Sequence, residues 1–104
     1  MLKFGIIGLG NIGKRHAKHI DANDLCSLEL GCDIDSTKNY ESLEIVSEDE
    51  FFKADLDVIN VCSPNYLHKE HVIKALKSGK HVVCEKHGSF IRNVERELCA
   101  FFGQ

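Results

Sequence analysis

The sequence predicts an α/β fold, with one doubly wound parallel sheet of about five strands and helices on both faces. Three observations carry this prediction. An apolar run at 2–7 leads straight into a glycine-rich turn and a basic, helix-like segment. Short apolar segments then alternate with segments of helical periodicity along the chain. One of them, at 57–62, is as apolar as a strand buried on both faces of a parallel sheet.

The first half of the chain predicts three strands, one full helix and one short crossover. Strands are expected at 2–7 and 28–33, with a helix from 11 to about 22 between them. The apolar residues assigned to the inner face of this helix are Ile12, Ala17 and Ile20. The segment 34–47 holds only about two turns of polar chain. The second crossover should therefore be abbreviated and lead to a short edge strand at 44–46.

A short helix is expected directly after that edge strand. Ser47 and Glu50 have the spacing of a capping box, which predicts a helix that runs through Lys53. Its two phenylalanines, Phe51 and Phe52, would pack toward the sheet.

The remaining elements follow from clear helix and strand signals. The strand at 57–62 is succeeded by a helix at 66–78, and Gly79 stands where a left-handed helix cap belongs. A fifth strand is expected at 81–84. The segment 89–102 predicts a C-terminal helix because its apolar residues recur at helical spacing. These residues are Phe90, Ile91, Val94, Leu98 and Phe101.

Chain direction and handedness then predict the order of the strands. Right-handed crossovers and the glycine turn give the order 3-2-1-4-5. The sheet reverses its winding between the first and fourth strands, which is where ligands bind in folds of this type. The turn at 8–13 and the segment 63–65 should therefore lie on two sides of one crevice.

Composition narrows the class of protein. With 104 residues, 43% of them hydrophobic and 28% charged, the chain has the make-up of one globular domain. A net charge of −3 and the absence of a long apolar run predict neither nucleic-acid nor membrane binding. The five cysteines are odd in number and have no CxxC spacing, so we interpret them as structural thiols of a cytoplasmic protein.

The glycine turn predicts a site for a pyrophosphate. Gly8 would permit the tight turn, Gly10 would leave room for the phosphates, and Gly13 would let helix and strand approach closely. The phosphates would bind backbone N–H groups near Asn11 and Ile12, at the positive end of the helix dipole. Glycines also serve ordinary turns, so this interpretation depends on the strand before the turn and the helix after it.

An acidic residue at the end of the second strand predicts the type of dinucleotide. Asp33 lies twenty residues beyond Gly13, where its carboxylate can accept hydrogen bonds from the adenosine ribose hydroxyls. Its charge would repel a 2′-phosphate, which favours NAD over NADP. Two alternatives stay open: Asp33 or Asp35 could cap the next turn, and Lys38 could offset the repulsion.

Two pairs of histidines are candidate metal ligands. His16 with His19, and His68 with His71, have i,i+3 spacing, but neither pair has a third ligand nearby in the sequence. We therefore predict surface histidines and no metal site.

At residues 1–86 the chain resembles the N-terminal domain of the Gfo/Idh/MocA oxidoreductases, a family named for glucose-fructose oxidoreductase, inositol dehydrogenase and a rhizopine catabolism protein. The resemblance is carried by three stretches: GIIGLGNIGKRHAKHI at 5–20, CDID at 32–35 and, most specifically, VINVCSPNYLHKEHVIKALKSGKHVVCEK at 58–86. It implies a Rossmann-like NAD(P)-binding domain. By composition alone, the segments around 63–65 and 85–86 would be a helix start and a solvated loop.

The resemblance also implies roles for single residues. It places Ser63, Pro64, Asn65 and His68 beside the nicotinamide half of the cofactor. Glu85 and Lys86 match the Glu-Lys-Pro motif of the family, whose lysine lies near the nicotinamide ribose and the substrate hydroxyl.

Two departures from the family pattern accompany the resemblance. His87 replaces the proline of the motif, and 87–104 no longer resembles the family, so we expect a helical tail of the same domain there. The α+β substrate domain of the family, with its acid/base histidine, is absent from the sequence. We therefore expect a truncated or frameshifted chain.

Two functions are consistent with these expectations. The first is an NAD-dependent dehydrogenase domain that oxidises a sugar, polyol or nucleotide-sugar hydroxyl, with the hydride passing from the substrate C–H to the nicotinamide and Lys86 as the catalytic residue in this chain. The short second crossover is similar to that of members acting on nucleotide-linked sugars. Alone, the chain would bind cofactor weakly and turn over poorly. The alternative is a non-catalytic remnant that binds nucleotide or self-associates through the sheet edge or the segment 88–104.

Overall fold

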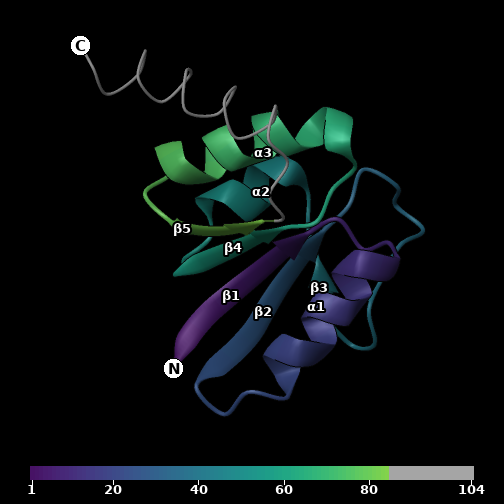
Figure 1. Cartoon of the computed structure of the whole chain (residues 1–104), viewed down its shortest axis with the longest axis vertical. Helices are drawn as coiled ribbons and strands as arrows, with labels where there is room; N and C mark the ends of the chain where they lie inside the picture. Colours follow the sequence, from purple (N-terminus) through teal and green to yellow (C-terminus); the bar gives the residue numbers. More distant parts are fainter. Residues whose placement is uncertain (85–104) are drawn as a thin grey trace.

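A five-stranded parallel sheet forms the centre of the computed structural model, which describes residues 1–84 (Figure 1). The strand order is β3-β2-β1-β4-β5, as the sequence predicted. In chain order the elements are β1 (Leu2–Ile7), α1 (Asn11–Asp21), β2 (Cys26–Cys32), β3 (Glu44–Ile45), α2 (Glu48–Lys53), β4 (Val58–Val61), α3 (Asn65–Lys77) and β5 (His81–Cys84). The C-terminal helix predicted at 89–102 lies outside the described residues.

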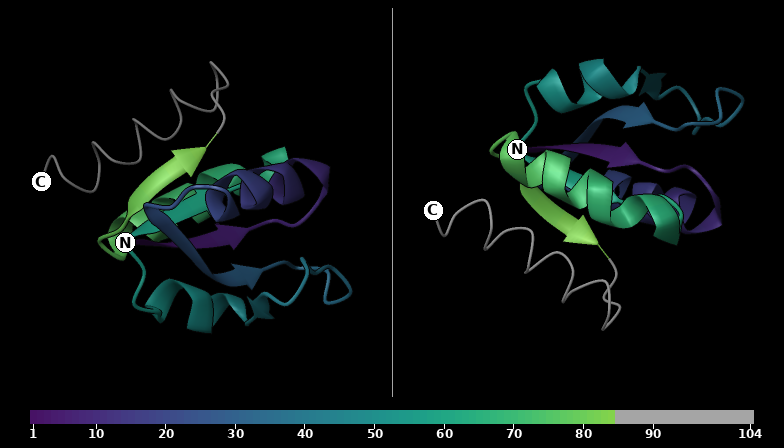
Figure 2. Two further views of the ribbon diagram at one scale, coloured as in Figure 1. Left: turned by 90° about the horizontal axis from the view of Figure 1, so that it is seen from below. Right: turned by 90° about the horizontal axis from the view of Figure 1, so that it is seen from above.

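Helices cover both faces of the sheet, and alternate residues of β1 point to opposite faces. Ile7 belongs to the core that includes Phe51 of α2 and Val72 of α3. Its neighbour Ile6 packs with Ala17 of α1 on the other face. Figure 1 shows α2 and α3 as neighbours, and Figure 2 shows α1 and α2 on opposite sides of β1 and β2. This is the arrangement that right-handed crossovers impose on the observed strand order.

The second crossover is short, as predicted. No helix connects β2 to β3; the chain runs through turns and bends, and Tyr40 and Leu43 pack against the core on the α1 face. β3 contains only two residues and pairs with Leu30 and Gly31 of β2. Two side chains of a loop thus cover sheet surface that a crossover helix would otherwise bury.

The expected caps are present at two helix ends. The Ser47 hydroxyl accepts a hydrogen bond from the backbone N–H of Glu50 at 3.3 Å, which starts α2. Phe51 of that helix is fully buried. Gly79, just after α3, has a φ of +81°, the left-handed conformation that favours glycine.

The structure corrects two details of the sequence prediction. β2 begins at Cys26, two residues before the predicted start, because it pairs with β1 from Leu2 onward. Ile12 was assigned to the inner face of the first helix, but its side chain is 46% exposed. The first turn of α1 overhangs the end of β1, so Ile12 lines a cavity instead of packing on the sheet.

The four cysteines within residues 1–84 differ in how far they are buried. Cys32 is buried, whereas Cys26, Cys62 and Cys84 are half-buried. Burial raises the pKa of Cys32 to about 11, so this thiol stays protonated at neutral pH. Within residues 1–84, no helix has the length and apolar character needed to cross a membrane.

Candidate functional site

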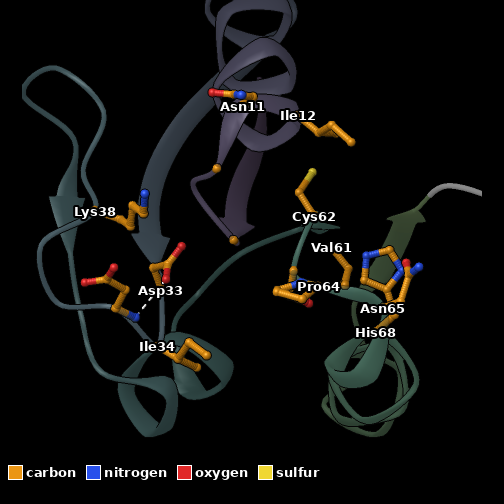
Figure 3. Close-up of a pocket in the computed structure, with 14 residues that line it drawn as sticks. Asn11, Ile12, Asp33, Ile34, Lys38, Val61, Cys62, Pro64, Asn65 and His68 are labelled. Atoms are coloured by element: carbon orange, nitrogen blue, oxygen red, sulfur yellow. Dashed lines mark hydrogen bonds between the residues drawn. The ribbon is translucent and has the colours of Figure 1, made fainter.

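A cavity of about 700 Å³ opens at the carboxyl ends of β1, β2 and β4 (Figure 3). This is the reversal point of the sheet, where the sequence predicted a crevice. The residues that line it are Gly8, Gly10, Asn11, Ile12, Asp33, Ile34, Asp35, Lys38, Val61, Cys62, Ser63, Pro64, Asn65 and His68.

The surroundings of the three glycines explain two of them and leave the third without a structural reason. Gly8 has a φ of +100°, and a Cβ there would lie 2.5 Å from the backbone of Cys62. A Cβ on Gly13 would lie 1.9 Å from the carbonyl oxygen of Gly8, so Gly13 lies beneath the turn and permits close packing. A Cβ on Gly10 would meet no protein atom within 4 Å. Nothing inside the described chain therefore requires glycine at position 10.

Asp33 holds the glycine turn in place. Its Oδ2 accepts a hydrogen bond from the backbone N–H of Leu9 at 2.7 Å, and its Oδ1 accepts one from the N–H of Asp35 at 2.8 Å. Oδ1 therefore caps the following turn, which was the alternative role for Asp33, while Oδ2 binds the glycine turn. Each carboxylate oxygen has two lone pairs, so each keeps the capacity to accept a further hydrogen bond, and Asp33 lines the cavity.

The segment after Asp33 forms the rim of the cavity. Asp35 accepts hydrogen bonds from the backbone N–H and the hydroxyl of Thr37, which lower the pKa of the Asp35 carboxyl. Lys38 extends along the same wall as Asp33 (Figure 3). Two carboxylates and one ammonium group therefore line this end of the cavity.

The opposite wall comes from the end of β4 and the start of α3. Ser63 and His68 are 5% and 6% exposed, while Pro64 and Asn65 are exposed at the helix start. The Pro64 carbonyl accepts hydrogen bonds from the N–H groups of Leu67 and His68. Behind this wall, the Asn60 amide lies within 3.2 Å of both the Cys62 sulfur and the His16 ring.

The prediction of surface histidines is wrong for the pair on α3. His68 is 6% exposed and His71 is 1% exposed. Residues three apart share a helix face, and on α3 this face points inward. His71 Nδ1 lies 2.7 Å from the Ser63 hydroxyl, and its Nε2 lies 3.3 Å from Glu48 Oε1. Desolvation lowers the pKa of His71 despite the nearby Glu48 carboxylate.

The structure brings most of the predicted site residues to one place. Nine of them line the cavity: Gly8, Gly10, Asn11, Ile12, Asp33, Ser63, Pro64, Asn65 and His68. Gly13 supports the turn from below, whereas Glu85 and Lys86 lie outside the described residues. Within residues 1–84, no three His, Cys, Asp or Glu side chains are placed to hold a metal ion.

Sequence reasoning missed the supports of this site. The contact of Ser63 with His71, and of His71 with Glu48, joins three elements. Val61 and Cys62 were assigned only to a strand, yet they also line the cavity. The position of Val61 and Cys62 at the carboxyl end of a central strand was the available signal.

Together, the sheet order, the glycine turn and the cavity at the reversal point define a Rossmann-type nucleotide-binding domain. The sequence model of the oxidoreductase family with an NAD-binding Rossmann fold, Gfo/Idh/MocA, matches residues 2–87. The chain belongs to this family.

Individual relatives agree with this assignment. An uncharacterized oxidoreductase of Streptococcus pneumoniae is 40% identical over 96 residues, which cover 83% of this chain and 25% of the relative. The 2,7-anhydro-N-acetylneuraminate hydratase of Escherichia coli is 35% identical over 91 residues, or 83% of this chain and 24% of that protein. The chain thus spans about a quarter of the length of these relatives.

A solved structure extends the similarity to the backbone. Scyllo-inositol dehydrogenase from Lactobacillus casei, solved with bound NAD(H) and scyllo-inositol, matches with a TM-score of 0.75 and 30% identity. The match covers 97% of this chain and 33% of that one.

Proposed function

We propose that this chain binds NAD across the cavity and forms the dinucleotide-binding part of a dehydrogenase for a sugar, polyol or nucleotide-sugar hydroxyl. One observation carries the proposal: the glycine turn with Asp33, and the wall at 63–65, face each other across one cavity. The open space above Gly10 fits the group, because a side chain there would obstruct only a ligand.

The ribose, the pyrophosphate and the nicotinamide half of the cofactor each have a partner in the cavity wall. Asp33 would accept hydrogen bonds from the adenosine ribose hydroxyls. The N–H groups near Asn11 and Ile12 would bind the pyrophosphate at the start of α1. When bound, NAD supplies the nicotinamide ring that accepts a hydride. The nicotinamide half would lie along 63–65 and His68.

The charges at the adenosine end favour NAD over NADP. A 2′-phosphate carries about two negative charges near neutral pH. It would have to lie beside Asp33 and Asp35, and within residues 1–84 Lys38 is the one lysine or arginine that lines the cavity and could offset them. Repulsion by two carboxylates should outweigh attraction by one exposed ammonium group.

The chemical step is expected to depend on residues beyond the described cavity. We propose that Lys86 positions and polarises the reacting hydroxyl, with Glu85 beside the cofactor. Removal of the ammonium group in Lys86→Ala should reduce turnover far more than it reduces NAD affinity. The relatives include a hydratase as well as a dehydrogenase, so NAD binding alone does not identify the net reaction. The reaction therefore needs an assay of its own, separate from the measurement of cofactor binding.

Calorimetric titration with NAD and with NADP tests the binding proposal. Heat of binding with NAD at up to millimolar concentration, and weaker binding of NADP, is the expected result. Folded protein that gives no heat with either cofactor would refute the proposal. A dehydrogenase assay across sugars, polyols and nucleotide sugars then tests the substrate class.

A further inference from the structure

Three side chains connect the cavity wall to the first turn of α2. Ser63 lies two residues after β4 and lines the cavity, and its Oγ lies 2.7 Å from His71 Nδ1 on α3. His71 Nε2 lies 3.3 Å from Oε1 of Glu48, the first residue of α2. This contact is possible because α2 and α3 are neighbours on the same face of the sheet (Figure 1).

The protonation of His71 follows from its two neighbours. The Glu48 carboxylate has no proton to donate, so the nitrogen that faces it is the one that should carry hydrogen. A neutral imidazole has a single N–H, which leaves Nδ1 bare. An unprotonated Nδ1 can only accept a hydrogen bond, and the Ser63 hydroxyl is the donor.

The surroundings of His71 keep the ring neutral near pH 7. Only 1% of the residue is exposed, and the Phe52 ring of α2 lies 6.2 Å away, centroid to centroid. Glu48 and Glu70 favour the charged ring, whereas burial, Lys74 and His68 oppose it. Burial has the largest effect and lowers the pKa of His71.

We propose that His71 is a positioning residue that turns the Ser63 hydroxyl into a hydrogen-bond acceptor toward the cavity. With its proton committed to His71, the Ser63 oxygen presents lone pairs to the ligand. This wall should then favour an N–H or O–H donor, such as the carboxamide or a ribose hydroxyl of the nicotinamide half. A phosphate or carbonyl oxygen would be disfavoured there. The identity of the ligand rests on the function proposed above.

A change of pH should reverse this polarity. A protonated imidazole carries hydrogen on both nitrogens, so Nδ1–H would donate to Ser63 Oγ. The hydroxyl proton of Ser63 would then point into the cavity. NAD affinity should fall as His71 becomes protonated.

The tautomer can be tested without any ligand. Long-range ¹⁵N–¹H NMR spectra of the full chain at pH 7.5 should show His71 protonated on Nε2 and bare on Nδ1. A ring protonated on Nδ1 would overturn the inference. Because no cofactor is present, this result is independent of whether the chain binds NAD.

Variants test the consequence for binding. His71→Leu and Ser63→Ala should each weaken NAD binding about threefold to tenfold at pH 7.5, as expected for one lost hydrogen bond. The double variant should be no weaker than either single one, because both remove the same interaction. Fully additive effects in the double variant, or wild-type affinity in His71→Leu, would overturn the inference.

The pH profile separates positioning from a purely structural role. His71→Asn keeps an acceptor near the position of Nδ1 but cannot titrate. This variant should bind NAD with wild-type affinity at pH 7.5. It should lack the fall in NAD affinity that protonation of His71 causes at lower pH. The matched control is His19→Asn, since His19 is exposed on α1 and does not line the cavity. Thermal unfolding checks that each variant is folded. An unchanged pH profile in His71→Asn would contradict the proposal.

Discussion

The substitution Gly10→Ala separates the fold from the binding site most sharply. Gly10 precedes α1 with φ −75° and ψ −165°, a conformation that alanine adopts without strain. Its Cβ would meet no protein atom within 4 Å. Alanine is the poorer residue before a helix, but it also loses less backbone entropy on folding. These two effects oppose each other, so the free energy of unfolding should change by less than about 1 kcal/mol.

Binding of NAD should respond very differently. The added methyl group would project into the cavity where the pyrophosphate is proposed to approach the backbone. Displacement of the phosphates from one backbone N–H should cost about 1.5–3 kcal/mol, the value of a hydrogen bond to a charged group. That corresponds to about 10- to 150-fold weaker binding. Calorimetry with NAD measures this difference, and thermal unfolding measures the stability.

Two other glycines provide controls. Gly13→Ala should destabilise the fold strongly, because its Cβ would lie 1.9 Å from the Gly8 carbonyl oxygen and the backbone would have to shift. Gly79→Ala, at a φ of +81° with no atom nearby, should destabilise by about 1–2 kcal/mol and leave NAD affinity unchanged. If Gly10→Ala binds NAD as tightly as the wild type, the assignment of the pyrophosphate to this turn is refuted.

Three further predictions concern the rim, the buried histidine and the core. Asp33→Asn removes a charge beside the adenosine end, so the preference for NAD over NADP should fall about fivefold in parallel titrations, a change of about 1 kcal/mol. His71 has a lowered pKa in the folded state, so its stabilising contribution is complete above the unfolded value of 6.5 and is lost as pH falls through the folded pKa. Melting temperatures should therefore drop between pH 7.5 and 5.5, and less so in His71→Asn. Phe51→Ala should lower the free energy of unfolding by about 3–5 kcal/mol in urea titrations, because the ring is fully buried.

The strands and their order could be predicted because local signals are strong in this chain. The segment 58–61 is buried at every position, and its apolar pattern, which Asn60 alone interrupts, correctly indicated a central strand. The two-residue strand β3 followed from a polar segment too short for a helix. The start of β2 was missed because it is determined by pairing with Leu2 of β1, and no local sequence pattern marks it.

The site could be predicted in outline but not in its contacts. Topology alone places 8–13 and 63–65 across one crevice, because the ends of adjacent parallel strands meet at one edge of the sheet. The exposure of Ile12 could not be inferred from helical periodicity, which does not show where the sheet beneath the helix ends.

Local sequence patterns were sufficient to predict the glycine turn, the alternation of strands and helices, and the acid at the end of the second strand. These features depend on residues near one another in the chain. Packing in three dimensions was needed to show that Asp33 accepts a hydrogen bond from the N–H of Leu9, 24 residues away, and that His71 lies between Ser63 and Glu48. Such contacts depend on how α2 and α3 pack on the sheet. Hydrophobic periodicity shows which face of a helix is buried, but it does not show which side chain of another element that face will meet.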